Sequence, residues 1–295
     1  MMKALYSGVS GMRSHQTKMD VIGNNIANVN TNGYKSQRAT FRDIYYQTMK
    51  SPNEATASTR GGTNASQVGY GAQIGSIDTI HTLSGYSPTN KSTDLYINGD
   101  GFFIVQNASN EQFLTRYGAF NFDSQGNLVD SNGSLVKGWN ATFTQNATNK
   151  TSEQSANPDT TTAIAPINLP FLNESFKNIT INADGTISAV AMVGGKKDTV
   201  VTIGQVAVAS VPNPEALVLE GNSYFSVGNN AGTPTYEVPG LDGTGALVAG
   251  GLEMSNVDLA NEFSEMIVTQ RGFQANTKII SVVDQMLEEL VNLKR

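Results

Sequence analysis

The sequence has no cysteine among its 295 residues, only two histidines and a single tryptophan. Without cysteine the chain forms no disulfide and offers no thiol nucleophile, and its redox compartment stays open. His15 and His81 have no second histidine or carboxylate at the spacing of a metal site. We therefore expect neither a zinc site nor a cofactor.

Long apolar runs and positive charge are also scarce. No stretch approaches the ~20 apolar residues of a membrane span, and the first residues lack the apolar run of a secretory signal. We expect no membrane insertion and no cleaved signal peptide. The 19 Lys and Arg residues are scattered among 25 Asp and Glu, for a net charge of -6, which argues against nucleic acid or an anionic membrane as a partner.

The two ends of the chain carry the clearest pattern. In residues 3–29, apolar side chains recur every seventh position, and a second row follows three residues later, which predicts a helix with one apolar stripe. The stripe consists of Leu5, Met12, Met19 and Ile26, and the second row of Gly8, His15, Ile22 and Val29. Because Gly8, Gly11 and Gly23 each cost about 1 kcal/mol against alanine, this helix should not be stable alone.

Residues 256–293 predict a second, longer helix with Ser255 as its N-cap. Its stripe, also spaced by seven, consists of Leu259, Met266, Phe273, Ile280 and Leu287, flanked by Phe263. A stripe of this kind is often only the core-facing side of a bundle. No other long helix is available here, so the two stripes should pair with each other, with copies in other subunits, or both.

The middle of the chain predicts short antiparallel strands separated by tight turns such as Asn98-Gly99. The expected fold is therefore mainly β with long terminal helices that form a coiled-coil-like domain. We assign residues 1–50 and 252–295 to the helical domain and 51–75 to a linker. Residues 76–140 and 179–251 form the central β-domain, and 141–178 form a polar insertion.

Two other classes of protein fit part of this pattern. A secreted β-rich adhesin would explain the strands and polar loops but not the paired terminal stripes. An enzyme such as a glycosidase would need a cleft that brings two of the scattered carboxylates together. Glycine runs such as 240–245 lack the GxGxxG spacing and are better explained as turns.

Three segments resemble the signatures of bacterial flagellar rod and hook proteins. The first covers residues 7–12 and 20–35, the second 94–103, and the third 255–259, 266–276 and 284–287. The resemblance spans both ends and the centre of the chain in the family's order, but not residues 141–178. The polar motif positions are Asn24, Asn25, Asn28, Thr31, Gly33, Tyr34, Asn256, Gln270, Arg271 and Asn276.

The resemblance implies a homo-oligomeric axial subunit, exported unfolded by the flagellar type III apparatus, whose terminal helices line the inner tube of a helical polymer. The expected polymer interface consists of Leu5, Met12, Met19, Ile22, Ile26, Val29, Leu259, Phe263, Met266, Phe273, Ile280 and Leu287. Its other partners would be rod, cap and hook-filament junction proteins.

The insertion at 141–178 is longer than rod proteins of this family require, so the resemblance favours the hook, outside the cell. There, a curved tube acts as a universal joint that transmits motor torque to the filament. The alternative is a distal rod subunit in the basal body, which forms a rigid drive shaft.

Overall fold

The computed structural model describes residues 2–54, 61–146, 151–156, 163–168, 177–193, 196–241 and 243–293. The chain divides into two compact units. Unit 1 comprises Met1–Val29, Ser36–Ile80 and Val257–Arg295, and unit 2 comprises Asn30–Lys35 and His81–Asn256. The expected fold class, mainly β with a helix near each end, is confirmed for the described residues.

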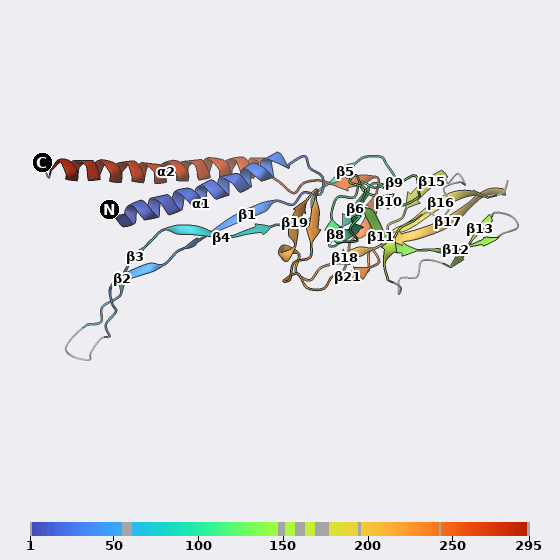
Figure 1. The fold of residues 1–295 in the computed structure, drawn as a ribbon, viewed down its shortest axis with the longest axis horizontal. Helices are drawn as coiled ribbons and strands as arrows, with labels where there is room; N and C mark the ends of the chain where they lie inside the picture. The colour runs from blue at the N-terminus through green and yellow to red at the C-terminus, as the bar shows by residue number, and fades with distance from the viewer. Residues whose placement is uncertain are drawn as a thin grey trace. The chain divides into compact units, whose positions relative to one another are not determined.

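Unit 1 contains the two long helices, α1 (Met2–Ala27) and α2 (Leu259–Asn292), which lie side by side (Figure 1). The start of α2 differs from the expected one. Asp258 is the N-cap, and its side chain accepts hydrogen bonds from the backbone N–H groups of Ala260 and Asn261. Ser255 as the N-cap is therefore wrong, because a carboxylate three residues later satisfies two of the free N–H groups of the first turn.

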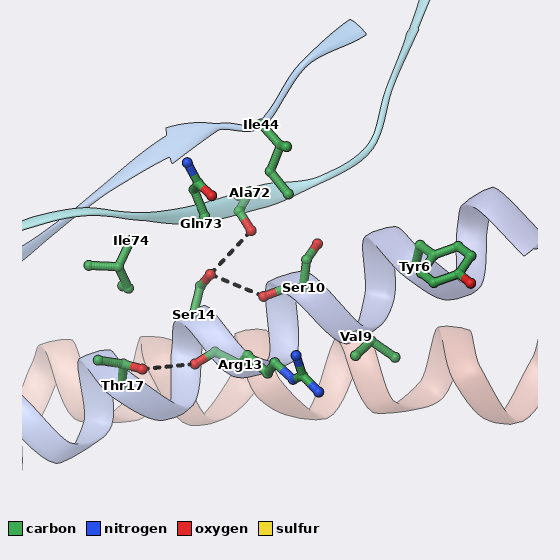
Figure 2. Close-up of a pocket in the computed structure, with 10 residues that line it drawn as sticks. All are labelled: Tyr6, Val9, Ser10, Arg13, Ser14, Thr17, Ile44, Ala72, Gln73 and Ile74. Carbon is green, nitrogen blue, oxygen red and sulfur yellow. Dashed lines mark hydrogen bonds between the residues drawn. The ribbon is translucent and has the colours of Figure 1, made fainter. Parts of the chain in front are cut away.

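Unit 1 also contains two pairs of antiparallel strands. β1 (Gln37–Asp43) pairs with β4 (Ala72–Thr79), and β2 (Tyr46–Lys50) pairs with β3 (Ser66–Gly69). α1 lies along the β1–β4 pair, where Ser14 Oγ is 3.2 Å from the Ala72 carbonyl oxygen (Figure 2). The stretch 51–75 was expected to be a linker, but it contains β3 and the start of β4.

The strand β2 was also not expected. Every residue of β2 is exposed, so its sequence shows no alternation of apolar and polar residues.

Unit 2 is built from short strands, and every pairing between its strands is antiparallel. The largest sheet has the order β15-β16-β17-β11-β7-β8-β20-β19 along its main path. The strands are β5 (Tyr86–Pro88), β6 (Leu95–Asn98), β7 (Phe102–Gln106), β8 (Gln112–Thr115), β9 (Asn121–Phe122), β10 (Leu128–Val129), β11 (Leu135–Asn140), β12 (Thr142–Asn146), β13 (Thr151–Ala156), β14 (Ala165–Pro166), β15 (Lys177–Ile181), β16 (Thr186–Val193), β17 (Lys196–Val206), β18 (Val208–Ser210), β19 (Val218–Gly221), β20 (Tyr224–Ser226), β21 (Thr235–Glu237), β22 (Ala246–Ala249) and β23 (Gly251–Glu253). A short 3-10 helix, Pro214–Ala216, precedes β19.

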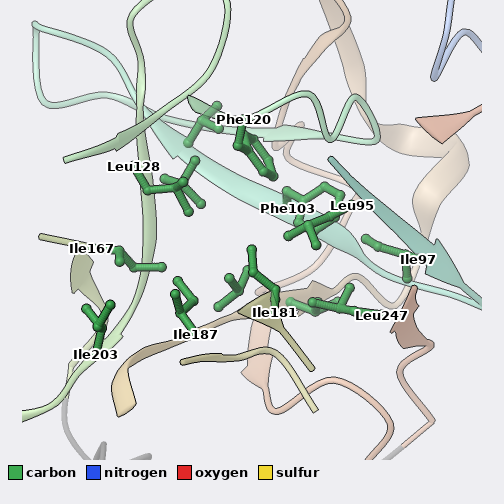
Figure 3. Close-up of a cluster of buried hydrophobic side chains, with 14 of the residues drawn as sticks. Leu95, Ile97, Phe103, Phe120, Leu128, Ile167, Ile181, Ile187, Ile203 and Leu247 are labelled. Atoms are coloured by element: carbon green, nitrogen blue, oxygen red, sulfur yellow. The ribbon is translucent and has the colours of Figure 1, made fainter. Parts of the chain in front are cut away.

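The core of unit 2 consists of two clusters of buried side chains on opposite faces of β7. Phe103 and Val105 belong to one cluster, and Phe102 and Ile104 to the other, because successive side chains of a strand point to opposite faces. Figure 3 shows the first cluster, which includes Leu95, Ile97, Phe120, Leu128, Ile167, Ile181, Ile187, Ile203 and Leu247. Both faces of β7 are buried, so it is a central strand of the unit.

The stretch 141–178 is partly described. β12 and β13 form an antiparallel pair, β14 pairs with β11, and Ile167 is fully buried in the first core cluster. The stretch therefore contributes at least one core residue, although its composition is polar. Residues 147–150, 157–162 and 169–176 lie outside the described residues, so the fold expected for the insertion there is not described.

Neither described helix is both long enough and apolar enough to cross a membrane. The inner-tube and outer-region roles assigned from the sequence stay predictions.

Candidate assembly surface

The two helices of unit 1 pack in opposite directions along their length. Lys18 near the end of α1 pairs with Glu265 in the second turn of α2 at 2.5 Å. Further back along α1, the Thr277 hydroxyl lies 3.8 Å from the Met12 sulfur. As residue numbers fall along α1, they rise along α2, so the packing is antiparallel. A coiled-coil geometry remains a prediction.

Glycines bring the helices close together. A Cβ at Gly11 would lie 2.8 Å from the Asn276 amide nitrogen, and one at Gly272 would lie 2.6 Å from the His15 ring. Gly8 also faces Asn276, at an ordinary contact distance. Two of the three glycines that weaken α1 as an isolated helix, Gly8 and Gly11, therefore lie where α2 approaches it, whereas Gly23 does not.

The expected interface residues divide into three groups by exposure. Ile22 is buried, and Leu259 and Phe263 are exposed. The others are half-buried: Leu5, Met12, Met19, Ile26, Val29, Met266, Phe273, Ile280 and Leu287. The buried residues of α2 are Thr269 and Val283. The face of α2 that packs inward is therefore offset from the predicted stripe of apolar residues spaced by seven. A polymer interface at these positions stays a prediction.

A second apolar stripe on α2 is exposed in the part of the chain that the structure describes. It consists of Ile279, Val282, Met286, Leu290 and Leu293, which are all exposed and are spaced by three or four residues. This spacing places them on one face of the helix. Figure 1 shows that α2 continues past the N-terminal end of α1, so its last turns have no helix opposite them. A contiguous exposed apolar stripe is typical of a protein interaction site.

A groove of about 360 Å³ lies between α1 and the neighbouring strands of unit 1 (Figure 2). It is lined by Tyr6, Val9, Ser10, Arg13, Ser14, Thr17, Ile44, Ala72, Gln73 and Ile74. The small hydroxyl side chains on α1 allow β4 to lie against the helix. The groove mixes apolar and polar groups and lies beside the helix pair.

The β2–β3 ribbon also exposes large side chains. Tyr45, Tyr46, Met49 and Val68 are all exposed, and the rings of Tyr45 and Tyr70 stack with centroids 4.8 Å apart. An isolated two-stranded ribbon is at best marginally stable in water. This exposed surface was not predicted from the sequence. The adjacent aromatic residues Tyr45 and Tyr46 were the signal that could have indicated it.

Asn25 is the best-defined of the polar motif residues. Its side-chain amide donates to the Gln37 carbonyl at 2.8 Å and to Glu262 at 3.0 Å, and its oxygen accepts from the Gln37 N–H. The residue is buried, and these bonds join the end of α1 to the start of β1 and to α2. Asn25 is therefore a structural clamp within unit 1.

The other motif residues of unit 1 lie in different surroundings. Asn28 donates to Asn24 within the last turn of α1. Asn276 fills the space left by Gly8 and Gly11. Gln270 and Arg271 are exposed on α2, and Arg271 donates to Gln274 at 3.1 Å.

The motif residues of unit 2 lie near one strand end. Gly33 has a positive φ of 73°, its N–H donates to the Glu253 carbonyl, and a Cβ there would lie 2.9 Å from the Tyr117 nitrogen. Tyr34 N–H donates to the Thr31 carbonyl. Asn256 donates to the Thr82 hydroxyl at 3.0 Å. The motif residues therefore lie at separate places within the two units and do not form one site.

A buried ion cluster in unit 2 was not predicted. Lys35 Nζ lies 2.6 Å from one Glu253 oxygen, Arg116 lies 3.4 Å from the other, and Lys35 also donates to the Thr82 carbonyl. Burial lowers the pKa of Lys35, while the charge of Glu253 opposes that shift. No sequence signal could link residues so far apart, although Lys35 does end the first family segment.

His81 lies beside this cluster and packs against the rings of Phe102 and Phe225, which also contact each other. Burial lowers the pKa of His81 to about 4, and the positive charges of Lys35 and Arg116 add to the shift. The imidazole is therefore neutral at pH 7. Within the described part of the chain, no three His, Cys, Asp or Glu side chains are grouped so as to hold a metal ion.

Family models match three regions of the chain. The model described as "Flagella basal body rod protein" matches residues 5–35, and "Flagellar hook protein FlgE/F/G D1 domain" matches residues 96–189. "Flagellar basal body rod FlgEFG protein C-terminal" matches residues 248–293. The three regions include both helices and much of unit 2.

Curated relatives match the chain from end to end. The flagellar basal-body rod protein FlgG of Bacillus subtilis is 43% identical over 296 aligned positions that cover all of both chains. The flagellar hook protein FlgE of Borreliella burgdorferi is 30% identical and the FlgG of the same organism 33%, each over all of both chains. These relatives are structural rod and hook proteins rather than enzymes, which speaks against the glycosidase alternative. The expected preference for hook is not confirmed, because the rod alternative fits these relatives better.

A helix pair with an uncovered apolar stripe, a β-rich second unit, three family regions and full-length relatives all lead to one conclusion. The chain belongs to the flagellar rod and hook protein family.

Proposed function

We propose that this chain is a subunit of the flagellar basal-body rod, and that copies of it polymerise into a tube through the helices of unit 1. The observation that carries the proposal is the exposed apolar stripe of α2, from Ile279 to Leu293. Burying apolar surface contributes roughly 25 cal/mol per Å², so a stripe of this size favours association. Heterologous contacts between identical subunits that do not close a ring produce an open helical polymer.

The length of the relatives supports rod over hook. The alignment with the Bacillus subtilis rod protein needs 296 positions for the 295 residues of this chain. The alignments with the hook proteins of Borreliella burgdorferi and Treponema pallidum run to 443 and 472 positions. Those hook proteins therefore contain long stretches with no counterpart here. A hook subunit is the second candidate, supported by full-length matches at 30% and 28% identity.

The remaining roles follow from this proposal. Unit 1 lines the inside of the tube, and unit 2 forms its outer part. The partners are further copies of the chain and other axial flagellar proteins, including rod, cap and hook-filament junction proteins. The chain reaches this place in the basal body through the flagellar type III export apparatus.

Electron microscopy of flagella tests the choice between rod and hook. We would replace the flagellar gene for this chain by a version that carries an epitope in the exposed turn at Asn107–Asn110, and label purified hook–basal bodies with antibody. Label on a straight segment inside the basal body is the expected result. Label along a curved tube outside the cell would assign the chain to the hook instead.

A matched pair of variants tests the assembly surface. Val282 and Val227 are exposed to 40% and 41%, but only Val282 lies in the apolar stripe of α2. Val282→Glu should abolish assembly in vitro and motility in cells, while Val227→Glu should leave both unchanged. Normal assembly of the Val282→Glu protein would contradict the proposed role of the stripe.

A further inference from the structure

A polar pocket in unit 2 is not used by the assembly surface described above. It has a volume of about 360 Å³. It is lined by Asn30, Thr31, Asn32, Tyr117, Ser131, Asn132, Asn222 and Ser223. None of these side chains is charged at neutral pH, and all can form hydrogen bonds. The pocket is therefore suited to a neutral, polar ligand.

The side-chain chemistry narrows the class of ligand. The four asparagine amides each carry a donor group and an acceptor group, and the three hydroxyls of Thr31, Ser131 and Ser223 can do either. Sugar hydroxyls also donate and accept, so they match such a lining. Tyr117 adds an apolar ring with a polar tip, which suits a ligand with both C–H and O–H groups. We propose that this pocket binds a saccharide.

One wall of the pocket is held rigidly by a buried carboxylate. Asp130 accepts hydrogen bonds from the backbone N–H groups of Asn132 and Ser134, each at 2.9 Å, and from the Tyr224 hydroxyl. Asn132 in turn donates to the Tyr224 hydroxyl at 3.0 Å. These bonds fix the turn that carries Ser131 and Asn132. A pocket whose walls are already formed avoids the cost of ordering those walls when a small ligand binds.

The opposite turn carries backbone strain. Asn222 and Ser223 both have positive φ, 52° and 62°, which residues with a side chain seldom adopt. The turn is held in place because the Thr115 hydroxyl donates to the Ser223 carbonyl at 2.9 Å and accepts from the Tyr117 N–H at 3.0 Å. Positive φ at both positions is what the two-residue loop between β19 and β20 requires, so the loop has one defined shape. Glycine would adopt this backbone conformation more easily. Asn222 and Ser223 stand there instead, and both line the pocket.

Ligand-observed saturation-transfer NMR on the full chain tests the inference, with cellobiose and diacetylchitobiose as separate probes. The method reports binding whether the protein is monomeric or assembled, so its outcome does not depend on the proposed rod function. We expect saturation transfer to at least one probe. Transfer to only the second would identify the acetamido group as the feature that is recognised. No transfer to either probe would overturn the inference.

A pair of double variants locates the site. Asn222→Gly with Ser223→Gly removes two lining side chains at positions where glycine suits the backbone, and should weaken binding at least tenfold. Asn90→Gly with Asn110→Gly makes a similar change at two other positive-φ positions, 58° and 64°, outside the pocket, and should leave binding unchanged. Equal binding by both double variants would overturn the assignment. A second result would also overturn the assignment. If the chemical shifts of the pocket residues changed with protein concentration but not on addition of sugar, a second copy of the chain would occupy the pocket.

Discussion

Lys35 and Glu253 lie 218 positions apart in the sequence, yet their side chains form an ion pair of 2.6 Å from which water is excluded. Arg116 approaches the same carboxylate from the other side. The cluster joins the short segment 30–35 to the body of unit 2. Because the cluster is buried, removing Glu253 would leave two cations without a carboxylate, whereas removing Lys35 would leave Glu253 paired only with Arg116.

Lys35→Met should lower the free energy of unfolding by about 1.5 to 3 kcal/mol, because it removes a buried charge-assisted hydrogen bond and leaves Glu253 paired only with the more distant Arg116. Urea unfolding followed by the fluorescence of Trp139 would measure it. Arg38→Met is the control, since Arg38 is largely exposed and its 3.9 Å pair with Asp78 should be worth about 1 kcal/mol or less. Equal losses in the two variants would show that the buried pair does not stabilise the fold.

His81 should make the stability of the protein depend on pH below neutrality. Its pKa is about 4 in the folded state against 6.5 for an ordinary histidine, so the unfolded chain binds the proton more readily. The stability that comes from the neutral imidazole is fully present above pH 6.5 and is lost as the pH falls from 6.5 towards 4. The slope should approach about 1.4 kcal/mol per pH unit within that window.

Unfolding measured from pH 7 to pH 4 on the parent and on His81→Gln would isolate this contribution as the difference between the two curves. The two curves should converge as the pH falls. Parallel curves would show that His81 titrates normally in the folded protein.

Glycine-to-alanine changes in the helices should differ in sign. At Gly23, a Cβ would meet nothing within 4 Å, so alanine should stabilise the protein by about 0.5 to 1 kcal/mol. At Gly272, a Cβ would press on the His15 ring at 2.6 Å, and overpacking typically costs about 1 to 3 kcal/mol. Far-UV circular dichroism during urea unfolding would compare the two. A stabilising Gly272→Ala change would mean that the helices do not approach each other as described.

Asp258→Ala should weaken the start of α2 by about 1 kcal/mol, because it removes the acceptor for two N–H groups of the first turn. Hydrogen exchange at Ala260 and Asn261 would report the loss directly. Ser255→Ala should leave exchange at these two amides unchanged. The reverse outcome would restore Ser255 as the cap.

Much of the architecture could be predicted from local patterns. The two helices follow from apolar spacing, and the antiparallel strands of unit 2 follow from turns such as Asn98-Gly99, which precedes β7 with its alternating buried faces. The ribbon β2–β3 could not be predicted in this way. Its side chains are all or nearly all exposed, so no buried face imposes a period of two on the sequence.

The inward face of α2 could be predicted only in part. The heptad reading selects large apolar residues such as Phe273, whereas the closest approach to α1 occurs at Gly272 and Asn276. Close approach of two helices favours small residues at the contact. The seven-residue spacing was read from large apolar residues only, so it does not find these positions. The pairing of Lys35 with Glu253 could not be predicted, because a contact between distant positions depends on the tertiary fold and leaves no local pattern.

The short segment 30–35 belongs to unit 2 although 45 residues of unit 1, Ser36–Ile80, separate it from the rest of that unit. Unit 2 is thus formed by two separate segments of the chain. A protein fragment that starts at His81 would keep the Glu253 carboxylate and Arg116 but lose the Lys35 ammonium group, which is the nearer of the two cations. Expression of the β-rich part by itself should therefore succeed only when residues 30–35 are supplied as well, either fused through a short spacer or added as a separate peptide.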